Sequence, residues 1–415
     1  MSKLTFSVLR HRQFRLLLLT RMCTMMALQA QAVIVGWQVY SITKDPFLLG
    51  LTGLVEAVPA VLCALFAGYV VDISHPQRIY FACISTLALN TLLLLIVAGG
   101  YAGFSDHHIV LYIFFGVFIS GLARSFGMPA AFSILPKIVP RSEIPAAAAW
   151  QSSTFQIGAI GGPAIAGLVY GGYGAHGAWL LPVLILSFAF IGVSFMRLPE
   201  HVRNPNPPKA FESIKEGWSF ILKNKTLLNV MAIDMFAVLF GGAVAMLPAF
   251  ADLVLHTGSE GLGALRAAPA IGAIVTATIL ALKPMKTISV KRLLFVVAGF
   301  GLCILGFGLS HSFWFALFFL ALSGAFDSVS MVIRGTLMQL LTPEQMRGRV
   351  SSVNSMFIIS SNEIGSFRSG VTAAWMGLVP SIILGAVMTL GVAGAGFAQK
   401  NFRNFAIKPD EEKSL

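Results

Sequence analysis

Charged residues are scarce in this sequence. Charged residues make up only 11% of the 415 residues, while hydrophobic residues make up 56%. A soluble domain carries about a quarter charged residues, so this shortage indicates lipid rather than water as the main solvent. The net charge of +12 does not indicate a nucleic-acid partner, because the basic residues lie in short hydrophilic gaps between long apolar runs.

The sequence also lacks the motifs of several enzyme classes. It contains no phosphate-binding loop, no His-Glu-x-x-His pair and no Gly-x-Ser-x-Gly elbow. Its four cysteines lie inside apolar runs without metal-ligand spacing, which is typical of small buried side chains. We therefore expect no enzymatic activity, no metal and no cofactor. Without a nucleotide-binding domain, ATP is not the direct source of energy.

Long apolar runs are what the sequence does have. A helix needs about 20 apolar residues to cross the hydrocarbon core, and these continuous runs lack the alternation of a barrel strand. The first run is read as a membrane helix rather than a signal peptide, because it continues to Tyr40 and is interrupted by Arg21. The predicted all-α membrane fold has spans at residues 14–41, 47–71, 78–101, 109–134, 145–171, 176–197, 226–254, 261–283, 291–310, 312–336, 350–375 and 378–399.

The Lys and Arg residues predict the orientation of these spans. They gather before the first span, between Arg197 and Lys225, between Lys283 and Arg292, and in the C-terminal tail. The opposite side has Lys44 and, near a helix end, Arg266. Because positive charge stays on the cytoplasmic side, both termini are predicted to be cytoplasmic, in a cell (inner) membrane.

A polar gap divides the chain into two halves of six spans. The expected organisation is an N-terminal half (1–197), a cytoplasmic linker (198–225), a C-terminal half (226–400) and a cytoplasmic tail (401–415). In the linker, Phe211, Ile214, Trp218 and Leu222 recur at helical spacing beside charged residues. This pattern predicts an amphipathic helix on the inner membrane surface. Two parallel halves joined by a cytoplasmic linker are typical of transporters built from repeats.

Three local patterns lie in or beside the predicted spans. Gly68, with Asp72 four residues later and then Arg78, follows the second span, and Thr342-Pro343-Glu344-Gln345-Met346-Arg347-Gly348-Arg349-Val350 joins spans ten and eleven. The fifth span contains Gly158, Gly162, Pro163 and Gly167. Together these patterns resemble the major facilitator superfamily of transporters, and in particular its enterobactin-exporter and macrolide-exporter branch. The resemblance covers nearly the whole chain, although Ile73 stands where an Arg is usual.

The resemblance implies a monomer with the major facilitator fold, in which these residues take part in conformational change. Asp72 would hold two inner helix ends together. The glycines of the fifth span let helix backbones approach closely, and Pro163 favours a bend. Ordinary tight packing is the alternative explanation of this glycine patch.

Several ionisable residues are expected at bilayer depth, where each charge costs about 2.5–3.5 kcal/mol on insertion scales. A carboxylate that exchanges protons beside a movable arginine would couple transport to a proton gradient. Fixed structural ion pairs, such as Asp327 with Arg334 seven residues later, are the alternative. The candidates for proton coupling are Glu56, Asp234, Asp327, Arg124 and Arg21.

Span eleven and span one carry polar stripes. In span eleven, polar residues recur every seven residues, which indicates one face along a water-filled cavity. Hydrogen bonds between helices are the alternative explanation for the uncharged side chains. The candidates for the substrate cavity are Gln29, Gln31, Gln38, Asn354, Ser361, Asn362 and Arg368.

The leading hypothesis is a proton-coupled exporter that moves an amphipathic small molecule, such as a siderophore or a drug-like compound, by alternating access. Its partners would be this substrate, protons and membrane lipid. Uptake or flipping of a lipid or metabolite is an alternative within transport. A membrane-embedded enzyme or a receptor is the alternative from another class, and no motif supports it.

The predicted topology can be tested by labelling single cysteines in intact cells. Cysteines placed at Asn206 and Glu411 should be protected from a membrane-impermeant thiol reagent, whereas a cysteine at Asp106 should react, because the basic segments stay inside. Labelling at Asn206 from outside would overturn this orientation.

Overall fold

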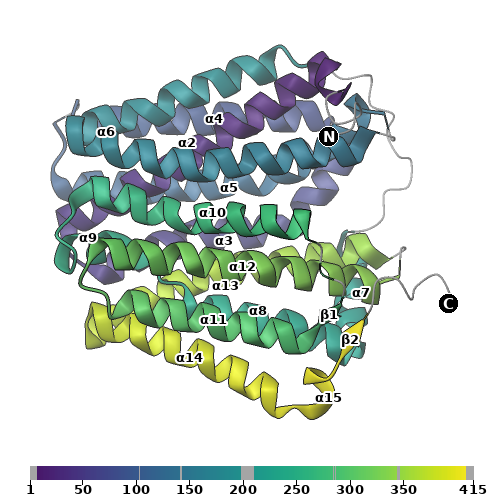
Figure 1. Cartoon of the computed structure of the whole chain (residues 1–415). Helices are drawn as coiled ribbons and strands as arrows, with labels where there is room; N and C mark the ends of the chain where they lie inside the picture. Colours follow the sequence, from purple (N-terminus) through teal and green to yellow (C-terminus); the bar gives the residue numbers. More distant parts are fainter. Residues whose placement is uncertain are drawn as a thin grey trace. The chain divides into compact units, whose positions relative to one another are not determined.

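A computed structural model describes residues 7–101, 103–140, 143–197, 210–283, 285, 287–343 and 346–407. The chain is overwhelmingly helical, as the apolar runs predict (Figure 1). Its elements are η1 (Val8–Arg10), α2 (Arg12–Thr43), α3 (Pro46–Ile73), α4 (Pro76–Ala98), α5 (Asp106–Ile138), α6 (Ile144–Ser194), α7 (Ala210–Lys223), α8 (Lys225–Gly241), η3 (Val244–Met246), α9 (Leu247–Leu253), α10 (Gly258–Leu282), β1 (Ile288–Ser289), α11 (Val290–Gly308), α12 (Phe313–Leu341), α13 (Arg347–Met376), α14 (Leu378–Ala398), α15 (Lys400–Arg403) and β2 (Ala406–Ile407).

Ten helical segments of the described chain are long and apolar enough to cross a membrane. Two of the predicted spans are absent from this set for separate reasons. Spans five and six form the single element α6, within which Gly174 has φ 63° and ψ −164°, a conformation open to glycine and not to a helical residue. Helix α13 has 30 residues but is too polar to qualify. The protein is thus an all-α membrane protein of the predicted class.

The first of two compact units contains residues 1–44, 55–210 and 258–267. Helix α2 packs along α6, and α4 packs against both α5 and α6 (Figure 1). Buried aliphatic side chains fill the space between these helices, among them Leu17, Ile84, Ile134 and Leu186. Elsewhere in this unit, Trp179 of α6 is fully buried and donates from Nε1 to Oε1 of Gln38 at 2.7 Å.

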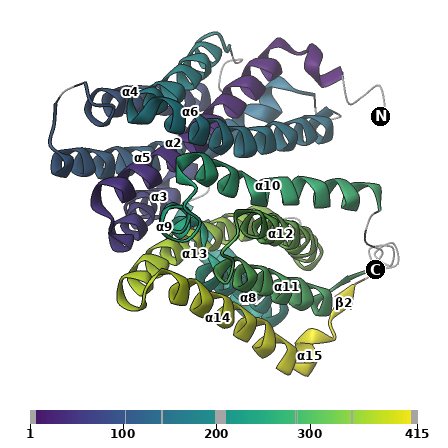
Figure 2. The same cartoon turned by 60° about the vertical axis from the view of Figure 1, so that its left-hand side comes forward.

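The second unit contains residues 45–54, 211–257 and 268–415. Helices α8, α11, α12, α13 and α14 pack against one another, with α15 and the strand pair β1–β2 at one end (Figure 2). Val290 N–H donates to the carbonyl of Phe405 at 3.0 Å, and Phe402 is buried in the same core. The first residues of the predicted tail, up to Ile407, therefore pack against the second unit.

Each unit includes a short segment from the other half of the sequence. The first turns of α3 belong to the second unit, where a Cβ on Gly50 would lie 2.7 Å from the Cα of Gly370 on α13. The first turns of α10 belong to the first unit, where a Cβ on Gly167 of α6 would lie 2.7 Å from the Cα of Gly263. Both helix crossings depend on paired glycines, because any larger residue would separate the backbones.

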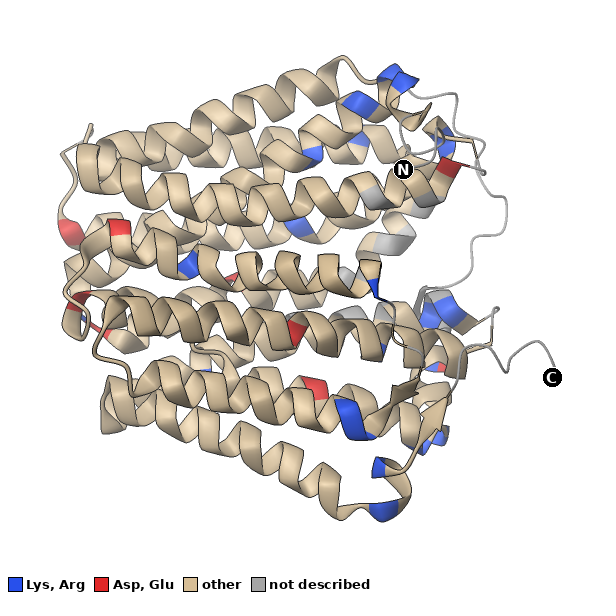
Figure 3. Ribbon diagram, viewed as in Figure 1, with Lys and Arg blue, Asp and Glu red and all other residues tan. Residues whose placement is uncertain are grey.

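Basic residues gather at one end of each unit. In the first unit this is the end at which α2 begins, and in the second it is the end that carries α15 (Figure 1 and Figure 3). Isolated charges remain along the middle of the helices, and they mark the candidate site.

The amphipathic helix predicted in the linker is present as α7, but it packs against α13. The ring of Trp218 stacks on Phe357 with centroids 5.5 Å apart, and Glu216 pairs with Arg349. Ile221 is 1% exposed in a small core with Val350 and other apolar residues. The sequence predicted the position of this helix correctly. Its apolar face, however, packs in part against α13 and is not available as a whole to the membrane surface. The proline-rich stretch before it lies outside the described residues.

We expect the docking of α7 to depend on Ile221 more than on the Glu216–Arg349 pair. Ile221→Ala should loosen the helix, since deleting a buried isoleucine side chain costs about 2–5 kcal/mol, while an exposed ion pair contributes about 0–1 kcal/mol. Limited trypsin digestion at Lys215 and Lys223 should therefore speed up markedly for Ile221→Ala and little for Glu216→Gln. Equal digestion of both variants would contradict this account of α7.

Candidate functional site

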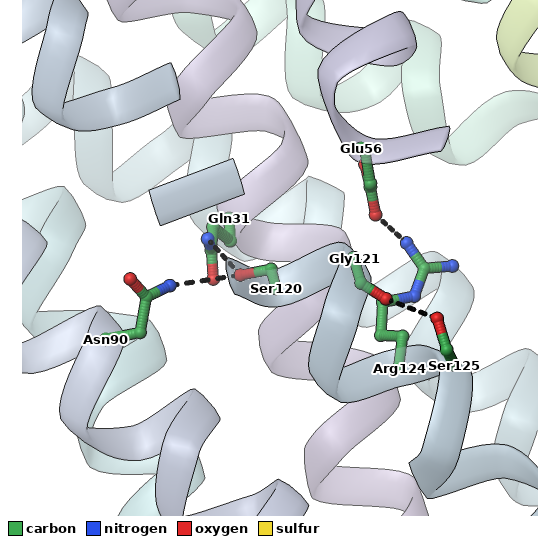
Figure 4. Close-up of polar contacts among 7 residues, drawn as sticks. All are labelled: Gln31, Glu56, Asn90, Ser120, Gly121, Arg124 and Ser125. Carbon is green, nitrogen blue, oxygen red and sulfur yellow. Dashed lines mark hydrogen bonds and ion pairs between the residues drawn. The ribbon is translucent and has the colours of Figure 1, made fainter. Parts of the chain in front are cut away.

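The first unit holds an ion pair between Glu56 of α3 and Arg124 of α5 (Figure 4). Gly121 makes this pairing possible, because any Cβ there would collide with the carbonyl oxygen of Glu56. One turn further along α5, Ser125 donates to the carbonyl of Gly121 at 2.9 Å. Both charged side chains are partly exposed, Glu56 at 27% and Arg124 at 43%. The structure therefore brings together two residues that the sequence selected as candidates for proton coupling.

A neutral polar network lies within the same unit. Gln31 Nε2 donates to Ser120 Oγ at 3.3 Å, and Asn90 Nδ2 donates to the same oxygen at 3.1 Å (Figure 4). Gln38 accepts from Trp179 and donates to the carbonyl of Ala98 at 2.7 Å. Both glutamines are only 4% exposed.

In this structure Gln31 and Gln38 are buried and join helices through hydrogen bonds, as the alternative explanation has it, and their role as cavity residues stays a prediction. Gln29 on the same helix is half-buried and packs near Gly162. It keeps its place as a cavity candidate.

Arg21, the other basic candidate of this unit, is not part of a carboxylate pair in the described chain. Its Nη1 donates to Gln151 Oε1 at 2.7 Å, and its guanidinium lies 5.9 Å from the ring centre of Phe132. In the described chain this cation is therefore held by a neutral amide and an aromatic ring.

The second unit holds a three-membered ionic cluster. Arg334 of α12 pairs with Asp234 of α8, and its Nη2 lies 3.9 Å from Oδ1 of Asp327, also on α12. The side chains of Asp234 and Arg334 are 9% and 13% exposed, and that of Asp327 is 44% exposed. One cation thus serves two carboxylates, which leaves the cluster with a formal charge of −1.

A small cavity adjoins this cluster. It is lined by Asp234 and Asp327, by Ser330, and by apolar residues that include Phe300, and its volume is about 10 Å³. That is about the space of one water molecule. The arrangement suits the delivery of a proton to a carboxylate better than the binding of an organic molecule. The sequence anticipated the Asp327–Arg334 contact, while the nearer partner, Asp234, comes from a different helix.

The polar stripe of α13 is accessible only in part. Asn362 is exposed and Asn354 is half-buried. Ser361 is 2% exposed and donates to the carbonyl of Ile358 in its own helix, so its place in a cavity stays a prediction. Arg368 lies near the other end of the stripe, against α8.

The glycines of the fifth span bring α6 against two neighbours. Gly158 and Gly162 face α2, where a Cβ on Gly162 would collide with the carbonyl oxygen of Met26. Gly167 faces the start of α10, and the carbonyl of Pro163 lies 2.7 Å from the position of a Cβ on Gly263. All these residues of α6 are buried. Close approach explains each glycine, as the sequence predicted.

The inner-loop pattern is described only in part. Gly68 and Asp72 belong to α3, but their side-chain surroundings lie outside the described residues. Arg78 is exposed in the first turn of α4. Among the described residues, no three His, Cys, Asp or Glu side chains lie close enough together to hold a metal ion.

A break in the seventh predicted span escaped the sequence analysis. The span Lys225–Leu253 is not one helix, because α8 ends at Gly241, and η3 and then α9 follow. The consecutive glycines Gly241 and Gly242 were the available signal, since two glycines weaken a helix.

Comparisons with known proteins agree with this architecture. A family model described as transmembrane secretion effector matches residues 3–412. The enterobactin exporter EntS of Shigella boydii serotype 4 (strain Sb227) is 24% identical over 91% of this chain and 89% of its own length. The EntS protein of Escherichia coli O1:K1 / APEC is 23% identical over the same shares.

Solved transporters share the fold. A bacterial homologue of the human lysosomal transporter Spinster, in an inward-facing and occupied conformation, has a TM-score of 0.72 at 14% identity and covers 94% of this chain and 97% of its own. A POT family transporter in complex with a thioalcohol-conjugated peptide has a TM-score of 0.74 at 11% identity, with coverages of 94% and 96%.

We expect Gly162→Leu to abolish transport while the protein remains inserted, because the larger side chain separates α6 from α2 at Met26. Gly172→Leu in the same helix is the matched control, since a Cβ there meets nothing within 4 Å. Dye efflux from cells, normalised to the amount of protein in the membrane, measures both. Full transport by Gly162→Leu would show that close α2–α6 packing is dispensable.

Proposed function

The chain belongs to the transmembrane secretion effector family of the major facilitator superfamily, and from this premise we propose that it is a proton-coupled exporter of an amphipathic small molecule. That it is a multi-pass membrane transporter and not an enzyme follows from the family and the fold. The direction of transport, the coupling ion and the substrate class are the proposal. So are the division into 1–197, 198–225, 226–400 and 401–415, the inner-membrane location and the cytoplasmic termini.

One observation carries the proposal: each unit holds a carboxylate paired with an arginine midway along its spans. These are Glu56 with Arg124 in the first unit and Asp234 with Arg334 in the second. Charges at this depth are costly and are kept where they serve transport. A proton that neutralises the carboxylate removes the attraction that holds the arginine, so protonation also changes what the arginine contacts.

This exchange supplies a way to drive transport. A proton that binds to Glu56 would weaken its ion pair with Arg124. When Glu56 loses this proton, the ion pair would form again. If the two states of the pair favour different conformations of the transporter, the proton gradient biases the cycle. The Asp234–Arg334–Asp327 cluster offers a second place for the same exchange, because Asp327 shares its cation with a closer competitor.

Export of a siderophore or a drug-like compound is supported by the likeness to EntS, whose name states that it exports enterobactin. Exposed aromatic and aliphatic side chains are abundant, and Asn354, Asn362 and Gln29 offer uncharged hydrogen-bonding groups. Uptake or flipping of a lipid or metabolite is the alternative with the same fold. The direction in which the protein concentrates its substrate across the membrane distinguishes this alternative from export.

Neutralising the essential carboxylate should remove transport driven by a pH gradient. We expect Glu56→Gln to have the largest effect, a loss of about tenfold or more, since glutamine cannot exchange the proton and removes the charged partner that Arg124 contacts. Asp234→Asn should rank second and Asp327→Asn third. Arg124→Ala should be more damaging than Arg124→Lys, which keeps the charge. In inverted membrane vesicles with an imposed pH gradient, accumulation of the substrate inside the vesicles measures the export activity of each variant.

The control for this experiment is a protonophore, which should stop efflux by the wild-type protein. Substrate binding should survive in Glu56→Gln, because Asn354 and Asn362 are unchanged. Proton coupling through these residues is excluded if the protonophore has no effect, or if all three neutral variants pump at the normal rate.

A further inference from the structure

The break in the seventh span leaves backbone carbonyls without helical partners inside the membrane. Helix α8 ends at Gly241, and Gly242 leaves helical geometry with ψ 75°. The final carbonyls of a helix lack intrahelical N–H groups and carry the negative end of the helix dipole. The span continues for another stretch to Leu253, so the break lies within the membrane-crossing segment and not at its edge.

Two consecutive residues of α13 contact this break. Arg368 donates from Nη2 to the carbonyl of Phe240 at 2.8 Å and to Ser369 Oγ at 2.9 Å. Ser369 in turn donates to the carbonyl of Gly242 at 3.1 Å. Gly385 of α14 leaves room for the guanidinium, since a Cβ there would lie 3.0 Å from Nη2. Three helices of the second unit thus position one arginine.

Capping the end of α8 uses only one of the three guanidinium nitrogens. Nε and Nη1 of Arg368 are buried and have no hydrogen-bond partner in the described chain. Asp234 and Asp327, two carboxylates of the same unit, are engaged with Arg334. An unpaired buried donor costs about 1–3 kcal/mol, and more when it is charged. A structural cap alone does not account for that cost, because a lysine would satisfy the same carbonyl.

Aromatic rings adjoin the arginine. Phe236 and Phe240 of α8 stack with centroids 6.0 Å apart and planes inclined by 15°, and Phe236 is 40% exposed. The Cζ of Arg368 lies 6.0 Å from the ring centre of Phe240. The stacked rings of α8 and the incompletely paired guanidinium of Arg368 on α13 therefore lie side by side at the break of the span.

We propose that Arg368, at the break of span seven, binds the anionic group of the transported molecule, and that the substrate is an amphipathic organic anion. Its ionised oxygen, in a carboxylate or sulfonate, accepts from Nε and Nη1, and its aromatic or aliphatic body packs on Phe236 and Phe240. This inference rests on the proposed function and gives it a substrate class. Nε and Nη1 are enclosed in the present structure, so the anion reaches them when the side chain or the break at Gly242 shifts.

The test uses two fluorescent dyes that differ by one sulfonate: anilinonaphthalene sulfonate, an organic anion, and phenylnaphthylamine, its neutral counterpart. Binding to the purified full-length protein is measured in nanodiscs of phosphatidylcholine, which has no net charge. We expect the wild-type protein to bind the anionic dye about tenfold more tightly, because hydrogen bonds to a charged group contribute about 1.5–3 kcal/mol. Arg368→Gln should lose this preference and keep its affinity for the neutral dye.

The matched control is Arg292→Gln. Arg292 is exposed and, like Arg368, donates to a backbone carbonyl, that of Thr287 at 2.8 Å. Its loss should leave the preference for the anionic dye unchanged. The inference is overturned if the wild type does not prefer the anion, or if Arg292→Gln reduces the preference as much as Arg368→Gln does.

A second measurement avoids any folding defect in the variants. Phenylglyoxal modifies arginines, and mass spectrometry reads the modification of Arg368 in the wild-type protein. The anionic dye should slow this modification and the neutral dye should not; equal rates with both dyes overturn the inference.

Dye export by whole vesicles separates the two proposals. If the neutral dye is exported while substitution of Arg368 leaves the anion preference intact, the proposed function stands and the anion site fails. If neither dye is exported by the wild type, the exporter proposal fails, and the binding result still decides the inference about Arg368.

Discussion

The cost of charge in a hydrocarbon medium is the constraint on which this structure depends. With charged residues at 11% of the chain, the ionic groups of the candidate site are held in pairs or in a cluster. Glu56 and Arg124 neutralise each other, whereas Arg334 serves both Asp234 and Asp327. These contacts join helices that lie far apart in the sequence, so the same interactions hold each unit together and supply its titratable groups.

Glycines at the helix crossings allow the charged side chains to reach their partners. Gly121 admits α5 close enough to α3 for Arg124 to reach Glu56, and Gly385 admits the guanidinium of Arg368 beside α8. In lipid, apolar side chains gain little by leaving their surroundings, so association depends on close backbone contact and on polar groups. A bulky residue at either position would separate the helices and leave a charge without its partner.

The sequence predicted the class of fold because the apolar runs are long and the basic residues lie on one side. It also selected Glu56 and Arg124 as candidates and expected Arg124 to face a carboxylate, but it did not decide which one, since helical periodicity relates residues of one helix only. For that reason the seven-residue spacing indicated Asp327 with Arg334 but gave no sign of Asp234 on α8. The hydrogen bonds of Gln31 and Gln38 to neighbouring helices could not be read from the sequence, because a polar residue on a helix face gives the same pattern whether it meets water or another helix.

If substrate movement and proton movement are obligatorily linked, as we propose, transport must change the pH inside sealed proteoliposomes. Purified protein is reconstituted with a trapped pH-sensitive dye, and a gradient of anilinonaphthalene sulfonate is imposed without any initial pH difference. The internal pH should shift in wild-type vesicles and not in protein-free ones, because the anion leaving one side drives protons the opposite way. Movement of the anion at the normal rate with no change in internal pH would contradict this linkage.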